Sequence, residues 1–362
     1  MNTVRGLFAP VPRLAAPVAT LGAFDGVHRG HQRILAETVA WARDAGGQAV
    51  VLTFDPLPKA VVGPGGALCI TSLPHRLALM QQCGLDLAVV VPFDATVAEM
   101  PAERFVRDVL LGWIGARRVV FGRDSTFGRK AEGDLALLRR LEADGLLAVR
   151  SPAPVRYRGG IISSTAIRQA IGAGGLRAAA AMLGRPFSLL GTVVRGEGRG
   201  RSLGFPTANL DLHHEAIPPD GVYATLAHVP SVAGSTDTGK MPVPPERDSG
   251  GTGFQPVGGG GEGGAGFQPV HFPAYPALTY VGRRPTFAAD DAATSIEVHV
   301  IGLEADLYGL DIEVRFVRRL RGDQRFPSAD ALVAQMEADR RAALRACRAA
   351  LRRTRPGPTT PS

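Results

Sequence analysis

The chain has 362 residues, of which 45% are hydrophobic and 20% are charged, so it is long enough for two globular domains with cores of their own. No run approaches about eighteen apolar residues and the start of the chain lacks the apolar centre of a signal peptide, so we expect no membrane partner. Three scattered cysteines, Cys69, Cys83 and Cys347, fit neither a disulfide framework nor a zinc site, which favours a cytoplasmic location.

The net charge of +8 comes mostly from arginines that are spread along the chain, while aromatic residues make up 6% of it. Proteins that stack nucleic-acid bases interleave basic and aromatic side chains, and we find no such stretch. We therefore expect no nucleic-acid partner and attribute the charge to a bias toward arginine. Some arginines are expected to face the phosphates of small ligands.

The first half of the chain alternates short apolar runs with segments of helical periodicity. Strands are predicted at Val18–Phe24, Ala49–Phe54, Leu87–Pro92, Arg118–Phe121 and Leu146–Val149. Helices are predicted at Gln32–Ala45, Leu73–Cys83, Ala102–Leu111 and Leu135–Ala143. This order indicates an α/β domain of Rossmann-like type, with a parallel sheet covered on both faces and its ligand at the carboxyl ends of the strands.

From about Phe187 the pattern changes to short alternating segments separated by turns rich in glycine and proline, which is typical of a small antiparallel β-barrel. Barrel strands are predicted at Gly191–Arg195, Gly221–Ala227, Ala277–Gly282, Ile296–Gly302 and Ile312–Leu320. Apolar residues at helical spacing in Ser328–Arg353 predict a terminal helix that packs against the barrel.

Residues 230–271 fit neither pattern, because glycine, proline, serine and threonine dominate them and the sequence GFQPV occurs twice. The repeat would suit a docking motif, but a low-complexity insertion in a hairpin loop costs little entropy and is the interpretation that we favour. The domains are therefore predicted at 1–185 and 186–353, with the insertion inside the second and a disordered tail at 354–362.

The turn GAFDGVHRGHQ follows the first predicted strand. His28 and His31 lie three residues apart where a helix starts, so both rings can face one ligand, and the N–H groups there favour phosphate. Gly30 leaves room for close approach of a nucleotide, and Gly22 and Gly26 serve the tight turn between the strand and the helix. We assign a catalytic role to the two histidines and ATP binding to Gly22, Phe24 and Gly30.

This arrangement resembles the nucleotidylyltransferase superfamily, in which a His-x-Gly-His motif stabilises the charge that develops at the α-phosphate. Such a transfer depends on alignment and electrostatic stabilisation more than on covalent help. The alternative is a zinc or structural histidine pair, which lacks further ligands at suitable spacing.

Three further segments resemble bacterial bifunctional riboflavin kinase/FMN adenylyltransferases, the FAD synthetases. TFDPLP (53–58) is similar to their mobile flap over the flavin, FGRDSTFGRKAEGD (121–134) to a second loop, and ISSTAIR (162–168) to a motif at a helix start. The resemblance implies flavin contacts from Phe54, Pro56, Pro58, Asp124 and Phe127. It implies ATP-phosphate contacts from Ser163, Ser164, Thr165 and Arg168.

A glycine-rich loop follows the strand predicted near residue 191, and it is not a Walker loop because no Gly-Lys-Ser/Thr follows. Read alone it would be a flexible surface loop. The next residues, GFPTAN, resemble the riboflavin kinase signature, which implies that Thr207 and Asn209 hold Mg²⁺ through hard oxygen atoms. Backbone N–H groups of the loop then approach the ATP phosphates, and we assign that role to Gly196, Gly198, Gly200 and Gly204.

The segments GVYA (221–224), YVGRRPTF (280–287), SIEVHV (295–300) and DLYG (306–309) continue the kinase pattern. The resemblance implies that Glu297 is the catalytic base that accepts the proton of the ribityl 5′-hydroxyl. From spacing alone it would be a solvated strand residue. His299, on the same face of the strand, is expected to be structural or supporting.

The resemblance runs from about residue 17 to 345 and departs from the family pattern at Ser125–Thr126, Ile301–Gly302 and Asp323. It implies phosphorylation of riboflavin by MgATP to FMN, followed by adenylylation of FMN by a second ATP to FAD and pyrophosphate. The expected partners are these small molecules, with a weak homo-oligomer left open. The alternatives are an adenylyltransferase with an inactive kinase domain, a flavin-binding protein without turnover, and a transferase of cytidylyl or pantetheine type.

Overall fold

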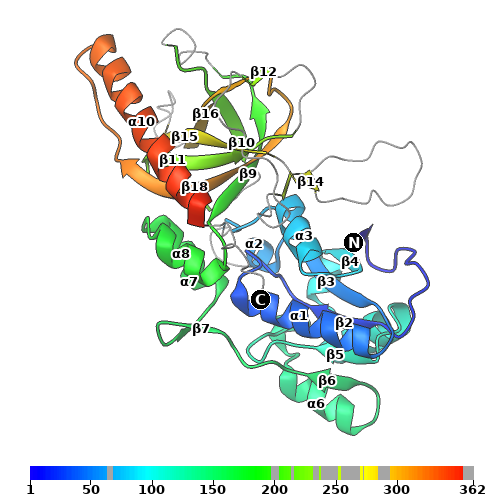
Figure 1. The fold of residues 1–362 in the computed structure, drawn as a ribbon. Coiled ribbons are helices and arrows are strands. Elements are labelled where there is room, and N and C mark those ends of the chain that lie inside the picture. Colours follow the sequence, from blue (N-terminus) through cyan, green and yellow to red (C-terminus); the bar gives the residue numbers. More distant parts are fainter. Residues whose placement is uncertain are drawn as a thin grey trace, which may run out of the picture. The chain divides into compact units, whose positions relative to one another are not determined.

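The computed structural model describes residues 1–62, 68–196, 204–212, 216–230, 236–237, 252–253, 270–271, 273–283 and 294–353. These residues form two compact units, which are drawn in Figure 1. The described residues of Met1–Ile167, with Met182–Gly184, form the first unit. Arg168–Ala181 group with the described residues from Arg185 onward in the second. The domain boundary at 185/186 stays a prediction, because this grouping divides the segment before it between the units.

The first unit is built on a six-stranded sheet in which all neighbouring strands run parallel. The sheet order is β1-β4-β3-β2-β5-β6. The strands are β1 (Asn2–Arg5), β2 (Val18–Leu21), β3 (Ala49–Asp55), β4 (Leu87–Pro92), β5 (Arg118–Val120) and β6 (Ala148–Arg150). The direction of the chain across the sheet reverses between β2 and β5, and the crevice outside such a reversal is where doubly wound sheets bind ligands.

Helices cover both faces of this sheet. They are α1 (Arg29–Asp44), α2 (Pro58–Val62), α3 (Leu73–Gln82), α4 (Ala95–Ala98), α5 (Ala102–Arg104), a π-helix (Phe105–Trp113) and α6 (Leu135–Ala143). The buried apolar side chains of this unit form two separate hydrophobic clusters. Val51 and Leu52, which are adjacent in β3, belong to different clusters, and so do Val89 and Val90 of β4. Successive side chains of a strand point to opposite faces, so both faces are buried, as predicted for a parallel sheet.

Short elements complete the region after β6. A hairpin pairs β7 (Arg156–Tyr157) with β8 (Gly160–Ile161), and it leads into α7 (Ser164–Gly172) and α8 (Leu176–Leu183). A short 3₁₀ turn (Arg129–Ala131) lies in the loop before α6.

The second unit contains a closed antiparallel barrel in the order β10-β16-β15-β11-β18-β9. Its strands are β9 (Ser188–Val194), β10 (Ala208–Leu212), β11 (Gly221–His228), β15 (Ala274–Arg283), β16 (Thr294–Val300) and β18 (Asp311–Arg321). Two further sheets have two antiparallel strands each. One pairs β12 (Thr236–Asp237) with β17 (Leu303–Glu304), and the other pairs β13 (Thr252–Gly253) with β14 (Val270–His271).

The barrel has a core inside and a second apolar layer outside. Inside, the Tyr223 ring packs edge-on against Phe316, whose ring also contacts Phe187. Outside, α10 (Ala329–Arg353) lies along β11, β15 and β18 (Figure 1). Its residues Ala343 and Cys347 are buried against the barrel. Closure removes the exposed strand edges that would invite aggregation.

The predicted fold class is confirmed, with the α/β unit first, the barrel second and a terminal helix. The strand predicted at Val18–Phe24 is β2, and it ends at Leu21 because the chain turns sharply there and Phe24 has φ 50°. The helix predicted at Ala102–Leu111 widens into a π-helix from Phe105. The expectations for most of the insertion and for the tail lie outside the described residues. No helix within the described ranges combines the length and the hydropathy that a membrane span requires.

Candidate active sites

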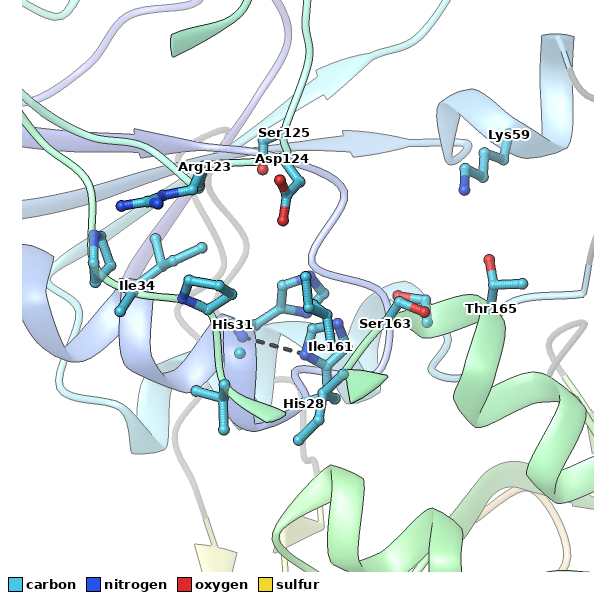
Figure 2. Close-up of a pocket in the computed structure, with 18 residues that line it drawn as sticks. His28, His31, Ile34, Lys59, Arg123, Asp124, Ser125, Ile161, Ser163 and Thr165 are labelled. Carbon is cyan, nitrogen blue, oxygen red and sulfur yellow. Dashed lines mark hydrogen bonds between the residues drawn. The ribbon is translucent and has the colours of Figure 1, made fainter. Parts of the chain in front are cut away.

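A cavity of about 300 Å³ opens in the first unit, where the loops that follow β2 and β5 meet the start of α7 (Figure 2). Both strands end at the point where the sheet order reverses, so the cavity has the location expected for a ligand of this fold. Predicted site residues that line it are His28, Gly30, His31, Asp124, Ser163, Ser164 and Thr165.

The turn between β2 and α1 depends on left-handed backbone conformations. Phe24, Gly26 and Val27 have φ values of 50°, 82° and 38°. A Cβ atom on Gly26 would lie 3.0 Å from Ile70, so glycine serves both the conformation and the packing there. The buried carboxylate of Asp25 accepts hydrogen bonds from the backbone N–H groups of Ile70 (2.7 Å) and Thr71 (3.2 Å), which fixes the turn against the chain that enters α3.

The two motif histidines form a stacked pair. Their ring centroids lie 3.5 Å apart with planes at 17°, and the backbone N–H of His31 donates to Nδ1 of His28 over 3.3 Å. His28 is therefore the N-cap of α1, and its neutral ring carries the proton on Nε2. A Cβ on Gly30 would lie 3.1 Å from the His28 ring, so the glycine between the histidines keeps the pair together.

Burial lowers the pKa of His31 well below 6.5, and the positive charge of Arg76 lowers it further. The ring is therefore neutral at pH 7, and it can donate a hydrogen bond but carries no positive charge. Its Nδ1 atom is buried without a hydrogen-bond partner among the described residues. An unprotonated nitrogen suits that place, which leaves the proton on Nε2.

Arg76 of α3 was not predicted as a site residue, yet it supports both loops above the sheet. Its side chain is 1% exposed, and its guanidinium donates to the carbonyl oxygens of Ala23 (3.1 Å) and Phe54 (2.8 Å). Burial lowers its pKa, against the opposing effects of the Asp25 and Asp55 carboxylates. No local sequence signal separates such an arginine from a solvated one on an amphipathic helix.

The three hydroxyls at the start of α7 have different partners. Ser163 Oγ accepts from the backbone N–H of Ala166 (3.2 Å) and caps the helix, whereas Ser164 Oγ donates to the carbonyl of Asp25 (2.9 Å). Thr165 is exposed in the cavity lining. Arg168, one turn later, groups with the second unit and is not among the lining residues.

The residues predicted to contact flavin are dispersed. Asp124 lines the cavity, whereas Phe54 packs edge-on against Phe93 (5.7 Å) in the core. Phe127 is likewise buried in that core, where its ring contacts Phe121 (5.5 Å).

The two prolines of the flap lie outside the cavity lining. Pro56 follows a cis peptide bond and Pro58 is the first residue of α2. The next residue, Lys59, does line the cavity and was not predicted. The flavin contacts of both loops therefore stay predictions.

A second cavity, of about 360 Å³, lies in the second unit between the outer face of the barrel and the start of α10. Its apolar lining residues are Phe205, Val222, Leu278, Phe326, Leu332 and Met336. Its polar lining residues are Thr207, Tyr280, Glu297, His299, Arg321, Asp323, Gln324 and Asp339. A cavity with both apolar and polar lining residues suits a ring system that carries a polar chain.

The predicted metal ligands and the predicted base lie together. Asn209 of β10 faces Glu297 of β16 in the strand register, and Thr207 Oγ1 donates to Glu297 Oε2 over 3.4 Å. A Cβ on Gly196 would overlap the Asn209 amide, so the backbone of Gly196 packs directly on that side chain. Gly204 is also described, with φ 80°, whereas Gly198 and Gly200 lie outside the described residues.

Two further residues support the second cavity. The Nδ1–H group of His299 donates to the carbonyl of Pro206 (2.8 Å), which holds the backbone just before Thr207. Tyr280 faces Glu297 from β15, and burial together with the charges of Asp323, Asp220 and Glu297 raises its pKa. Sequence reasoning assigned the tyrosine no role at the site, because it lies in an alternating barrel strand.

Comparison with known proteins gives each unit a family. The FAD synthetase model matches residues 12–166, and the riboflavin kinase model matches residues 183–347. The bifunctional riboflavin kinase/FMN adenylyltransferase of Escherichia coli K12 is 32% identical over 94% of this chain and 96% of its own length. That of Listeria monocytogenes is also 32% identical, over 89% and 90%.

A solved structure agrees over nearly the whole chain. A crystal structure described as a macrolide-efflux protein from Streptococcus pneumoniae matches with a TM-score of 0.74 and 28% identity, covering 95% of this chain and 99% of that one. Together with the two family models, these matches cover both units. The chain belongs to the family of bifunctional riboflavin kinase/FMN adenylyltransferases.

Proposed function

We propose that each of the two cavities carries one step in the synthesis of FAD. The chain is a bifunctional enzyme, a riboflavin kinase and an FMN adenylyltransferase. It uses ATP to convert riboflavin to FMN and then FMN to FAD. The observation that carries the assignment of sites is that each cavity is lined by motif residues of one activity, the His-x-Gly-His pair in the first and Thr207 with Glu297 in the second.

In the kinase cavity, the isoalloxazine ring of riboflavin is proposed to lie against the apolar wall of Phe326, Leu332 and Met336, with its ribityl chain toward Glu297. The carboxylate of Glu297 accepts the proton of the terminal hydroxyl as that oxygen attacks the γ-phosphorus of ATP. The hydrogen bond from Thr207 orients this carboxylate. ADP leaves with the electrons of the broken bond.

Mg²⁺ fits this site by the chemistry of its donors. The Thr207 hydroxyl and the Asn209 amide offer neutral oxygen atoms beside the Glu297 carboxylate. Among the described residues there is no cluster of three histidine, cysteine or acidic side chains, so phosphate oxygens would complete the coordination. When bound, the ion would neutralise charge on the phosphates. The residues proposed to hold it are Thr207 and Asn209.

In the adenylyltransferase cavity, the FMN phosphate is proposed to attack the α-phosphorus of ATP with release of pyrophosphate. The Nε2–H groups of His28 and His31 donate hydrogen bonds to the oxygen atoms whose charge increases in the transition state. The N-terminus of α7 and the exposed Thr165 hydroxyl face the remaining phosphates. Alignment supplies most of the rate, because phosphoryl chemistry needs little covalent help.

The test is chromatography of flavins after incubation of the purified chain with riboflavin, ATP and Mg²⁺. FMN that appears first and is then converted to FAD is the expected result. Unchanged riboflavin together with FAD formation from added FMN would indicate an inactive kinase, and no product from either flavin would indicate a binding protein. The efflux named for the Streptococcus pneumoniae structure is not carried over, because the family models and the curated relatives agree on flavin enzymes.

A further inference from the structure

The adenylyltransferase cavity has few charged groups for the ligands that it takes. Its described lining contains Lys59 and Arg123 as cations and Asp124 as an anion. The FMN phosphate carries about two negative charges at neutral pH, and the triphosphate of ATP adds more. Such ligands need nearby cations in addition to a divalent ion.

The histidine pair does not supply that charge. The lowered pKa of His31 keeps its ring neutral at pH 7, and Nδ1 of His28 accepts a hydrogen bond, as a neutral ring does. Both rings therefore donate hydrogen bonds without adding charge. A positive charge on the protein side of the cavity has to come from another residue.

Lys59 is placed to supply it. It is the second residue of α2, directly after the segment TFDPLP, and its side chain is exposed with no ion pair to any residue in the described part of the chain. Figure 2 shows its ammonium end directed into the space beside Ser163 and Thr165 at the start of α7. In the same view the guanidinium of Arg123 is directed toward Ile34, away from these hydroxyls.

We infer that Lys59 is a phosphate-binding residue of the adenylyl-transfer site and that it acts opposite the N-terminus of α7. The inference rests on the proposed function of this cavity. The helix end and Thr165 contact a phosphate from one side, and the ammonium group contacts it from the flap. Phosphate is the chemistry recognised, and either the monoester of FMN or the triphosphate of ATP can provide it.

The experiment measures steady-state FAD formation from FMN with K59Q, K59R and wild-type protein, varying FMN and ATP separately at low and high ionic strength. In K59Q we expect the KM of one substrate to rise about five- to tenfold, by loss of one charge-assisted contact, with a smaller change in kcat. The substrate whose KM rises identifies the phosphate. K59R should restore most of the affinity, and the difference from wild type should shrink at high salt.

Lys130→Gln is the matched control, because Lys130 is an exposed lysine of the same unit outside the cavity lining. An equal effect of this change would overturn the inference, since it would indicate a general effect of net charge. Unchanged KM values in K59Q would also overturn it. If wild-type protein forms no FAD from FMN, the proposed function fails and takes the inference with it, whereas FAD formation that is indifferent to Lys59 removes the inference alone.

Discussion

The Nδ1 atom of His28 accepts a hydrogen bond from the backbone N–H of His31, so one motif histidine caps the helix that carries the other. A substitution at His28 therefore has two effects, on the helix and on the chemistry. We expect H28A to lower FAD formation about 10²- to 10³-fold, the usual result of removing one donor to a developing charge. It should also lower the free energy of unfolding by about 1 kcal/mol through loss of the cap.

H28N separates the two effects, because asparagine is a good N-cap that lacks the imidazole. Denaturation should give H28N nearly wild-type stability, while flavin chromatography should find it as inactive as H28A in forming FAD from FMN. Formation of FMN from riboflavin should be unchanged in both variants. Normal FAD formation by H28N would assign His28 to the cap alone.

The depressed pKa of His31 predicts how stability depends on pH. Below pH 6.5 the unfolded chain binds a proton at His31 that the folded chain does not, so the free energy of unfolding should fall as the pH decreases from 6.5 toward the lowered pKa. Above pH 6.5 the His31 ring is neutral in both the folded and the unfolded chain, so it causes no loss of stability there. Denaturant unfolding of wild-type protein and H31Q at pH 7.5 and 5.5 measures the effect.

We expect H31Q to lose less stability between the two pH values than wild-type protein loses. The remaining histidines are common to both proteins and cancel in the difference. Equal losses would mean that the His31 ring is protonated as readily in the folded chain as in the unfolded one, against the burial of its Nδ1 atom.

Sequence patterns were sufficient for most of the long strands and helices in their order and for the two motif clusters, although β10, α7 and α8 were not among the predicted elements. Buried runs such as residues 49–54 and 87–92 read as parallel strands because both of their faces are apolar. The strand β1 was missed, because its four residues, NTVR, are largely polar and pair only with β4 at the edge of the sheet. Edge strands carry little hydrophobic pattern.

The site residues that sequence reasoning missed depend on contacts between distant parts of the chain. Arg76 is separated by 53 residues from Ala23, whose carbonyl it binds. Ser164 was predicted as a phosphate contact, but its hydrogen bond to the carbonyl of Asp25, 139 residues away in the sequence, was not. Nothing in the local sequence distinguishes Arg76 from an exposed arginine. Lys59 was missed for the same reason, since only the fold brings the flap to the start of α7.

Replacement of Arg76 tests how much the loops above the sheet depend on it. R76M keeps the apolar stem but leaves the buried carbonyl groups of Ala23 and Phe54 without their donor, which should cost about 1–3 kcal/mol of unfolding free energy. FAD formation from FMN should fall because the His28 turn loses its support, and FMN formation should stay unchanged. R33M is the matched control, since Arg33 is exposed on α1 and most surface changes stay within about 0.5 kcal/mol.

Glu297 is expected to affect the kinase step alone. E297Q keeps the shape and the neighbours of the side chain but cannot accept the proton, so FMN formation should fall about 10²- to 10⁴-fold. FAD formation from added FMN should match that of wild-type protein. E304Q, at an exposed glutamate of β17, should retain both activities. Near-normal FMN formation by E297Q would assign the proton acceptor to another group.

Gly282 tests the position of Tyr280 in the kinase cavity. The Tyr280 ring lies over Gly282, two residues along the same face of β15, where a Cβ atom would overlap the phenol. In G282A the ring has to move, and it lies beside Glu297 in the cavity wall. We expect the KM for riboflavin to rise several-fold.

FAD formation from FMN by G282A should be unchanged, which separates this local effect from a loss of fold. The control is G302A, because Gly302 has φ 82° but open space around its Cβ position, so that change strains the backbone without moving a cavity residue. It should lower stability by about 1 kcal/mol and leave the KM for riboflavin unchanged. If G282A binds riboflavin as tightly as wild-type protein, the Tyr280 ring has no part in shaping the cavity.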